Sequence, residues 1–154
     1  MAAAPGHKRH ATGVLDATVS AGLSVLRVFA FQDGPGGLQH APGEFSEDWY
    51  RALDFVVHEA GQRGLRLILV LTNYAPEGGG MRVLRRWSCA RRGVLPEDDS
   101  PDAFFSDPAC QDLYKTSLVK LIDRENTLTH TAYRYDHMIA CLIVASNPGG
   151  NHQG

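Results

Sequence analysis

The sequence predicts an α/β fold built on a parallel sheet, and three observations carry this prediction. Helix-like and strand-like stretches alternate along the 154 residues. Residues 65–71 form a nearly continuous apolar run, which is typical of a parallel strand covered on both faces. The segments after the first two strand-like stretches are long and rich in turn-forming residues, and in α/β folds such loops carry the chemistry. The functional residues are therefore expected where the strands end.

The first third of the chain predicts one short helix and one strand. Residues 1–13 are small, polar and basic, and we expect them to be a disordered N-terminus. Residues 14–21 predict a helix that ends at Gly22, and residues 23–31 are rich in the β-branched and aromatic side chains that favour strands. Glycines and prolines punctuate residues 32–43, which predict a loop.

The next helix carries the clearest signals. Ser46 is a suitable N-cap, acidic residues follow it in the first turn, and Gly64 supplies a left-handed stop. The helix presents an apolar face at helical spacing, made of Trp49, Leu53, Val56 and Ala60. The apolar run 65–71 follows at once and predicts the second strand.

The remainder of the chain repeats this order. Residues 73–80 predict a loop, 81–91 a helix, and 93–106 a second long loop. Asp107 followed by Pro108 predicts a helix start, since proline is favoured at the first helical position. That helix is expected to bury Leu113, Ser117, Leu118, Leu121 and Ile122. Residues 138–145 predict the third strand, and 149–154 a flexible tail, so one unit spans residues 14–148.

Composition excludes several classes of function. A net charge of −2 gives no electrostatic reason to expect nucleic acid or a membrane surface as a partner. Three widely spaced cysteines and seven scattered histidines form no metal-binding motif, so we expect no metal and no cofactor. The first residues lack the apolar run of a signal peptide, so the protein is intracellular or its true N-terminus is missing. The compartment stays undetermined.

Four features could carry function, and each has a plainer interpretation beside it. The run Gly78–Gly80 could cradle a phosphate, but no GxGxxG or GK[ST] motif accompanies it, which favours a tight loop. Arg27 lies inside an apolar strand, where it needs a carboxylate or substrate oxygen as partner unless it faces water on a sheet edge. Asn73 could reach a ligand or close a turn. Trp87 could stack on a sugar ring, although core packing is the more common role.

Together these features resemble one family, the plant-type endo-β-mannanases of glycoside hydrolase family 5. The similarity runs in unbroken order over residues 14–140. It rests on five collinear pieces: Val25–Gly34, residues 53–73, Gly79-Gly80 with Trp87, residues 102–108 with Tyr114-Lys115, and residues 126–133.

The resemblance implies a partial (β/α)8 barrel, holding about strands 2 to 4 with their helices. It implies hydrolysis of mannan or glucomannan with retention, by two glutamates about 5 Å apart. Arg27 would orient the nucleophile, while Asn73, Trp87 and Phe31 would bind substrate. The family also suggests a secreted protein.

The sequence departs from the family pattern where the chemistry is centred. The fourth strand of the family ends in a Trp-Glu-x-x-Asn-Glu-Pro type motif whose second glutamate is the acid/base. Here the matching stretch is residues 138–148, which places Asn147 or Ser146 at that position, and no glutamate follows Glu125. Neither side chain can act as a tuned carboxylic acid, so we expect this chain to be inactive.

The change of pattern after Ala140 suggests a truncated or mis-spliced reading frame. Three parallel strands would also leave open edges, which invite aggregation. Two alternatives to an enzyme fragment remain. One is a non-catalytic carbohydrate-binding remnant, and the other is a small unrelated α/β domain of nucleotide-binding type.

Overall fold

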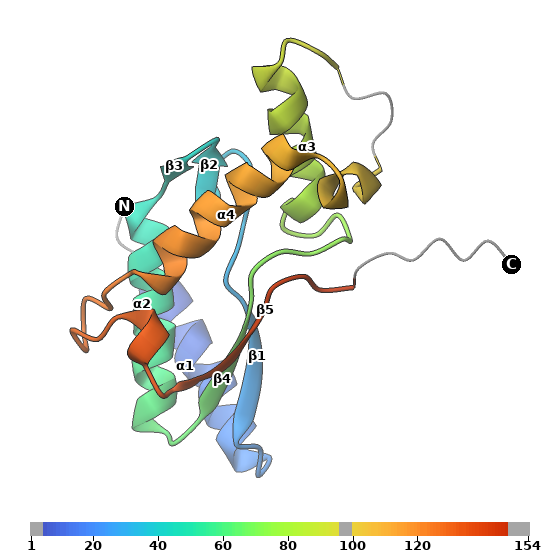
Figure 1. The fold of residues 1–154 in the computed structure, drawn as a ribbon. Helices are drawn as coiled ribbons and strands as arrows, with labels where there is room; N and C mark the ends of the chain where they lie inside the picture. The colour runs from blue at the N-terminus through green and yellow to red at the C-terminus, as the bar shows by residue number, and fades with distance from the viewer. Residues whose placement is uncertain (1–4, 96–99, 148–154) are drawn as a thin grey trace, which may run out of the picture.

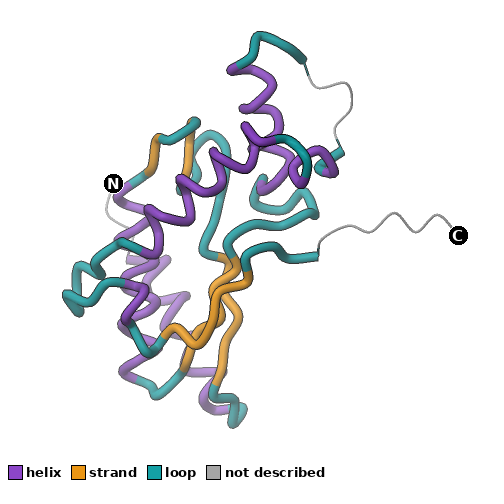
Figure 2. The backbone as a smooth tube through the Cα atoms, viewed as in Figure 1, coloured by secondary structure: helices purple, strands orange, loops and turns teal. Residues whose placement is uncertain are grey.

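A three-stranded parallel sheet organises the molecule, as predicted. The computed structural model describes residues 5–95 and 100–147. The sheet has the order β1-β4-β5, with strands β1 (Val25–Phe29), β4 (Arg66–Val70) and β5 (Ile139–Ile143) (Figures 1 and 2). The helices of the described residues are α1 (Pro5–Ser20), α2 (Glu47–Gln62), α3 (Gly80–Arg91) and α4 (Pro108–Ile122). The short 3-10 helices η1 (Asp102–Phe105) and η2 (Tyr133–Tyr135) lie in the connections.

The sheet has two unlike faces. Leu67 and Leu69 are completely buried on the face that α1, α2 and α4 cover (Figure 1). The alternate residues of β1 point to the opposite face, where Val25 is 44% and Phe29 54% exposed. Because no described helix covers that face, the expectation of a β4 strand covered on both sides is only half right. Ile68, on the uncovered face of β4, is half-buried.

The N-terminal helix is longer than the sequence indicated. It begins at Pro5, so the expected disorder of residues 1–13 is wrong for residues 5–13. Tertiary contacts with α2 explain the difference: Lys8 lies 5.0 Å from the Phe55 ring centroid, and Arg63 Nε donates to Asp16 Oδ1 over 2.6 Å. Residues 1–4 and the tail predicted at 149–154 lie outside the described residues.

Helix α2 starts as predicted, and its predicted apolar face is correct in part: Ala60 is buried, and Leu53 and Val56 are partly buried against the core. The Ser46 side chain accepts from Trp49 N over 3.4 Å, and Gly64 has a φ of 69°. Trp49 is 42% exposed, whereas the buried residues are Tyr50, Asp54, Val57 and Ala60. The sequence prediction left Asp54 out of the buried face of α2, because hydrophobic spacing counts only apolar side chains. In α4 the buried residues are likewise Cys110, Leu113, Tyr114 and Leu121, so the expected burial is correct only in part.

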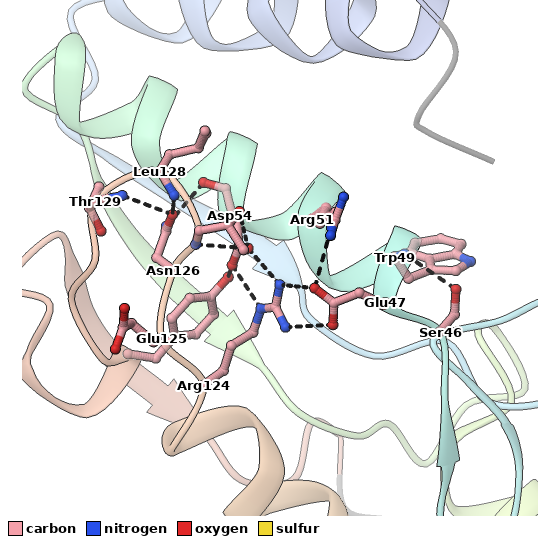
Figure 3. A network of polar contacts seen from close by, with 12 residues as sticks. Ser46, Glu47, Trp49, Arg51, Asp54, Arg124, Glu125, Asn126, Leu128 and Thr129 are labelled. Atoms are coloured by element: carbon pink, nitrogen blue, oxygen red, sulfur yellow. Dashed lines mark hydrogen bonds and ion pairs between the residues drawn. The ribbon is translucent and has the colours of Figure 1, made fainter.

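A polar network accounts for the buried Asp54 (Figure 3). Its carboxylate, completely buried, accepts from Arg124 Nε over 2.8 Å and from Arg124 Nη2 over 2.6 Å. It also accepts from Tyr133 Oη over 2.8 Å and from the Thr127 hydroxyl over 2.9 Å. Arg124 reaches outward to Glu47 as well, with bonds of 2.9 and 3.0 Å. The network holds the connection between α4 and β5 against α2.

The sequence did not reveal one further element. Within and just after the predicted loop 32–43, strands β2 (Gln39–Ala41) and β3 (Glu44–Phe45) form an antiparallel hairpin beside α4. No described helix is long and apolar enough to cross a membrane. Among the described residues there is also no cluster of three or more histidine, cysteine or acidic side chains that could hold a metal ion.

Candidate functional site

The candidate site lies where the three parallel strands end. The segment after β4 and the segment after β5 continue side by side: Ser146 N donates to Thr72 O over 3.0 Å, and Tyr74 N donates to Ser146 O over 3.1 Å. These bonds place Asn73 beside Ser146. Carboxyl ends of parallel strands are the usual position of ligand sites in α/β folds.

Arg27 joins this cluster from the neighbouring part of the sheet. Its Nη2 atom donates to Ser146 Oγ over 2.6 Å, across 119 residues of sequence. Its guanidinium also lies 5.2 Å from the centroid of the Phe29 ring. Arg27 is thus on an edge strand, as one interpretation held, yet it is not simply solvated. Its partner in this structure is a hydroxyl group, whereas the sequence suggested a carboxylate or a substrate oxygen.

Asn73 is fixed by its backbone, and one of its buried side-chain atoms has no hydrogen-bond partner among the described residues. The residue is 4% exposed, and its carbonyl oxygen accepts from Met81 N over 3.2 Å at the start of α3. Within the described part of the chain, its Oδ1 atom and the neighbouring Thr72 Oγ1 have no hydrogen-bond partner. A buried acceptor without a partner costs free energy, so an amide held in this way suits a ligand that can donate to it.

The two residues that the resemblance places at the acid/base position differ in exposure. Ser146 is 3% exposed and faces Arg27, whereas Asn147 is exposed and has a φ of 48°. Asparagine tolerates this left-handed conformation better than most residues. Ser146 is therefore the member of the pair that contributes to the cluster.

Trp87 and Phe31, as described, make no hydrogen bond to this cluster. Trp87 sits on α3, half-buried and packed against the hydrophobic core, which agrees with the plainer interpretation of that residue. Phe31 is 8% exposed and meets Phe29 edge to face, with ring centroids 5.6 Å apart. The contacts of the described residues therefore bring together Arg27, Asn73 and Ser146, and Phe31 is linked to Arg27 only through the ring of Phe29.

Sequence reasoning missed Asp33, which follows β1 and lies beside the first residues of α3. Gly79, the N-cap, has no side chain to cap the helix, and the Asp33 carboxyl accepts from the backbone N–H of Gly80 instead. Burial raises the pKa of Asp33 to about 7, and the bond from Gly80 partly opposes this rise. The Asp-Gly dipeptide after an apolar strand was the available signal.

The glycines at residues 78–80 permit close backbone approach. A Cβ on Gly79 would lie 2.3 Å from Asp33 O, and one on Gly80 would lie 2.5 Å from Asn73 O. The tight-loop interpretation is therefore correct. A phosphate would have to displace the Asp33 carboxyl from the helix N-terminus, which argues against a nucleotide site.

Comparison with known proteins decides the family. Residues 2–153 match the model of a group described as glycoside hydrolase family 5, β-mannosidase-like. The chain belongs to this family. The alternative of an unrelated nucleotide-binding domain is therefore wrong. Mannan endo-1,4-β-mannosidase 2 of Oryza sativa subsp. japonica is 39% identical over 149 residues, covering 96% of this chain and 33% of that protein. Mannan endo-1,4-β-mannosidase 2 of Arabidopsis thaliana is 37% identical over 144 residues, covering 92% and 33%.

Solved structures of family 5 proteins share the fold. An endo-1,4-β-D-mannanase from Thermotoga petrophila gives a TM-score of 0.78 at 26% identity, covering 89% of this chain and 40% of that chain. A mannosidase from Rhizomucor miehei gives a TM-score of 0.81 at 20% identity, covering 90% and 38%. These likenesses confirm the prediction of a partial (β/α)8 barrel. The chain spans about a third of the length of the curated relatives it matches.

Proposed function

We propose that this chain forms the part of a family 5 barrel that binds β-1,4-mannan or glucomannan. We also propose that this part does not hydrolyse the polysaccharide by itself. The observation that carries the proposal is the bond of 2.6 Å between Arg27 and Ser146, at the strand ends where the resemblance places the acid/base. It is supported by the relatives named mannan endo-1,4-β-mannosidase, which match nearly the whole chain.

The chemistry of the acid/base position supports the lack of hydrolysis. Retaining glycosidases need a carboxylic acid that protonates the leaving oxygen and a carboxylate nucleophile. A serine hydroxyl or an asparagine amide cannot deliver that proton at neutral pH. Ser146 and Asn147 occupy the position, and the 154 residues hold no glutamate after Glu125. The cluster can donate and accept hydrogen bonds but contains no proton-transfer group.

Within this proposal the polar residues have distinct roles. Arg27 presents a guanidinium group at the sheet surface, where in an active relative it would orient the nucleophile. Asn73 offers its unpaired Oδ1 to a sugar hydroxyl. Trp87 and Phe31 are proposed as apolar walls of the substrate cleft, as the resemblance implies. Because Phe31 is buried and Trp87 is half-buried, they would pack beneath the residues that contact the sugar.

The test measures binding and hydrolysis separately. We expect the chain to be retarded in native gels that contain galactomannan, not to be retarded in gels that contain a soluble cellulose derivative, and to release no reducing ends from either. Arg27→Ala should abolish the retardation, whereas Arg51→Ala, which changes an exposed arginine on α2, should leave it intact. Release of reducing ends by the wild-type chain would overturn the inactive assignment. Equal mobility in all gels would overturn the binding assignment.

A further inference from the structure

A small internal cavity lies between the loop after β1, α2 and α4, away from the Arg27 cluster. Its volume is about 20 Å³, and its polar lining consists of Asp33, Gln39, Tyr50, Tyr114 and Ser117. A water molecule needs on the order of 10–15 Å³ of such volume together with two to four polar partners. The cavity therefore has room for one water and for nothing larger.

Two of the lining side chains have polar atoms without a partner in the described structure. Gln39 is 1% exposed, and its Nε2 atom has no acceptor. Tyr50 is 2% exposed, and its hydroxyl has no partner either. An uncompensated buried donor destabilises the folded state, so two of them on the lining of one cavity require an explanation.

The orientation of the Gln39 amide does not remove the problem. Its Oε1 atom accepts from Ser117 Oγ over 2.7 Å. If the amide were rotated by 180°, Nε2 would donate to Ser117 and Oε1 would lose its partner instead. In either orientation one amide atom faces a cavity where only a small polar molecule can satisfy it.

We propose that this cavity is a hydration site in which one water molecule accepts from Gln39 Nε2 and bonds to the Tyr50 hydroxyl and the Asp33 carboxyl. Three partners match the usual number for a buried water. Burial raises the pKa of Tyr50 to about 12, so its hydroxyl keeps its proton at neutral pH and has one to share. The water links α2 and the β2–β3 hairpin to Asp33, and through Asp33 to the start of α3.

A crystal structure of the whole chain, at a resolution that shows ordered water, tests the site directly. We expect a density peak within hydrogen-bond distance of both the Gln39 amide and the Tyr50 hydroxyl. A direct bond between those two side chains, or the absence of a peak, would overturn the proposal.

The sign of one substitution gives an independent test in solution. If the hydroxyl of Tyr50 binds water, Tyr50→Phe removes a hydrogen bond and lowers the urea midpoint of unfolding. If the hydroxyl is truly without a partner, the same change relieves a cost, and the midpoint stays or rises, which would contradict the proposal. Tyr114→Phe is the control, because that hydroxyl lines the same cavity but already donates to the Val144 carbonyl. It should lower the midpoint in either case.

Discussion

Replacing Asp54 with alanine should destabilise this protein more than any other single loss of a charge among the described residues. The Asp54 carboxylate is completely buried and accepts five hydrogen bonds, two from Arg124, one from Tyr133 and two from Thr127. Without it, Arg124, whose side chain is 10% exposed, keeps Glu47 as its carboxylate partner and the ring of Tyr50 as a stacking partner. Breaking a buried ion pair on one side costs about 3–5 kcal/mol.

The matched controls divide the network into its inner and outer parts. Glu47→Gln removes the outer partner of Arg124. The Glu47 side chain is 55% exposed, so water screens the pair and its loss should cost about 0–1 kcal/mol. Tyr133→Phe removes one bond to the buried carboxylate and should cost about 1.5–3 kcal/mol. The expected order of destabilisation is therefore Asp54→Ala, then Tyr133→Phe, then Glu47→Gln.

Urea titration followed by far-UV circular dichroism measures these differences, provided the slopes of the transitions agree. An Asp54→Ala variant within about 1 kcal/mol of the wild type would refute the reasoning. A Glu47→Gln variant as unstable as Asp54→Ala would also refute it, since the outer pair would then contribute as much as the buried one.

The same network sets a pH dependence whose sign follows from the pKa shifts. Burial raises the pKa of Asp54, but bonds from Arg124, Tyr133 and Thr127 outweigh it and hold the pKa below 3.8. The bonds from Arg124 lower the pKa of Glu47 below 4.5. Between the folded and unfolded pKa values the unfolded chain binds more protons, so stability rises with pH there. The stabilisation is complete above about pH 4.5 and is lost as the pH falls through the depressed folded values. Asp54→Ala should weaken this acid dependence.

Three further predictions concern the start of α3 and its contact with α4. Gly79→Ala should lower the free energy of unfolding, measured by urea titration, more than Gly22→Ala does. Both glycines have positive φ, which costs alanine about 1–2 kcal/mol, but only the Gly79 Cβ would meet backbone, at 2.3 Å. Equal losses would contradict this prediction. In the wild type, Asp33 should make the stability fall as the pH rises from about 4 to 7, because its folded pKa near 7 exceeds the ordinary 3.8 and the folded state binds the extra proton in that range. Asp33→Asn should remove this fall, and an unchanged pH profile would contradict the prediction. Asp107→Ala should cost about 2–4 kcal/mol, because it removes the cap on Ala109 N and leaves the buried Ser88 hydroxyl without its acceptor; a Tm equal to the wild type's would exclude this.

Local signals in the chain were reliable where they act over a few residues. The Ser46 cap, the Asp107-Pro108 helix start and the stop at Gly64 all lie where the sequence placed them. Capping and left-handed stops depend on groups within one helical turn, so their physics is complete in a short window. The hairpin β2–β3 was missed because its turn residues are also those of an irregular loop.

The sequence by itself determined the alternation of helix and strand, the parallel sheet and the family. Only the tertiary structure decided which side chains meet. Arg27 and Ser146 are 119 residues apart in sequence, and Asp54 and Arg124 are 70 apart. The helical connections between the parallel strands bring the members of each pair together. A buried charge becomes tolerable when a distant partner arrives, and hydrophobic periodicity carries no record of that partner. For this reason the predicted face of α2 left out the buried Asp54.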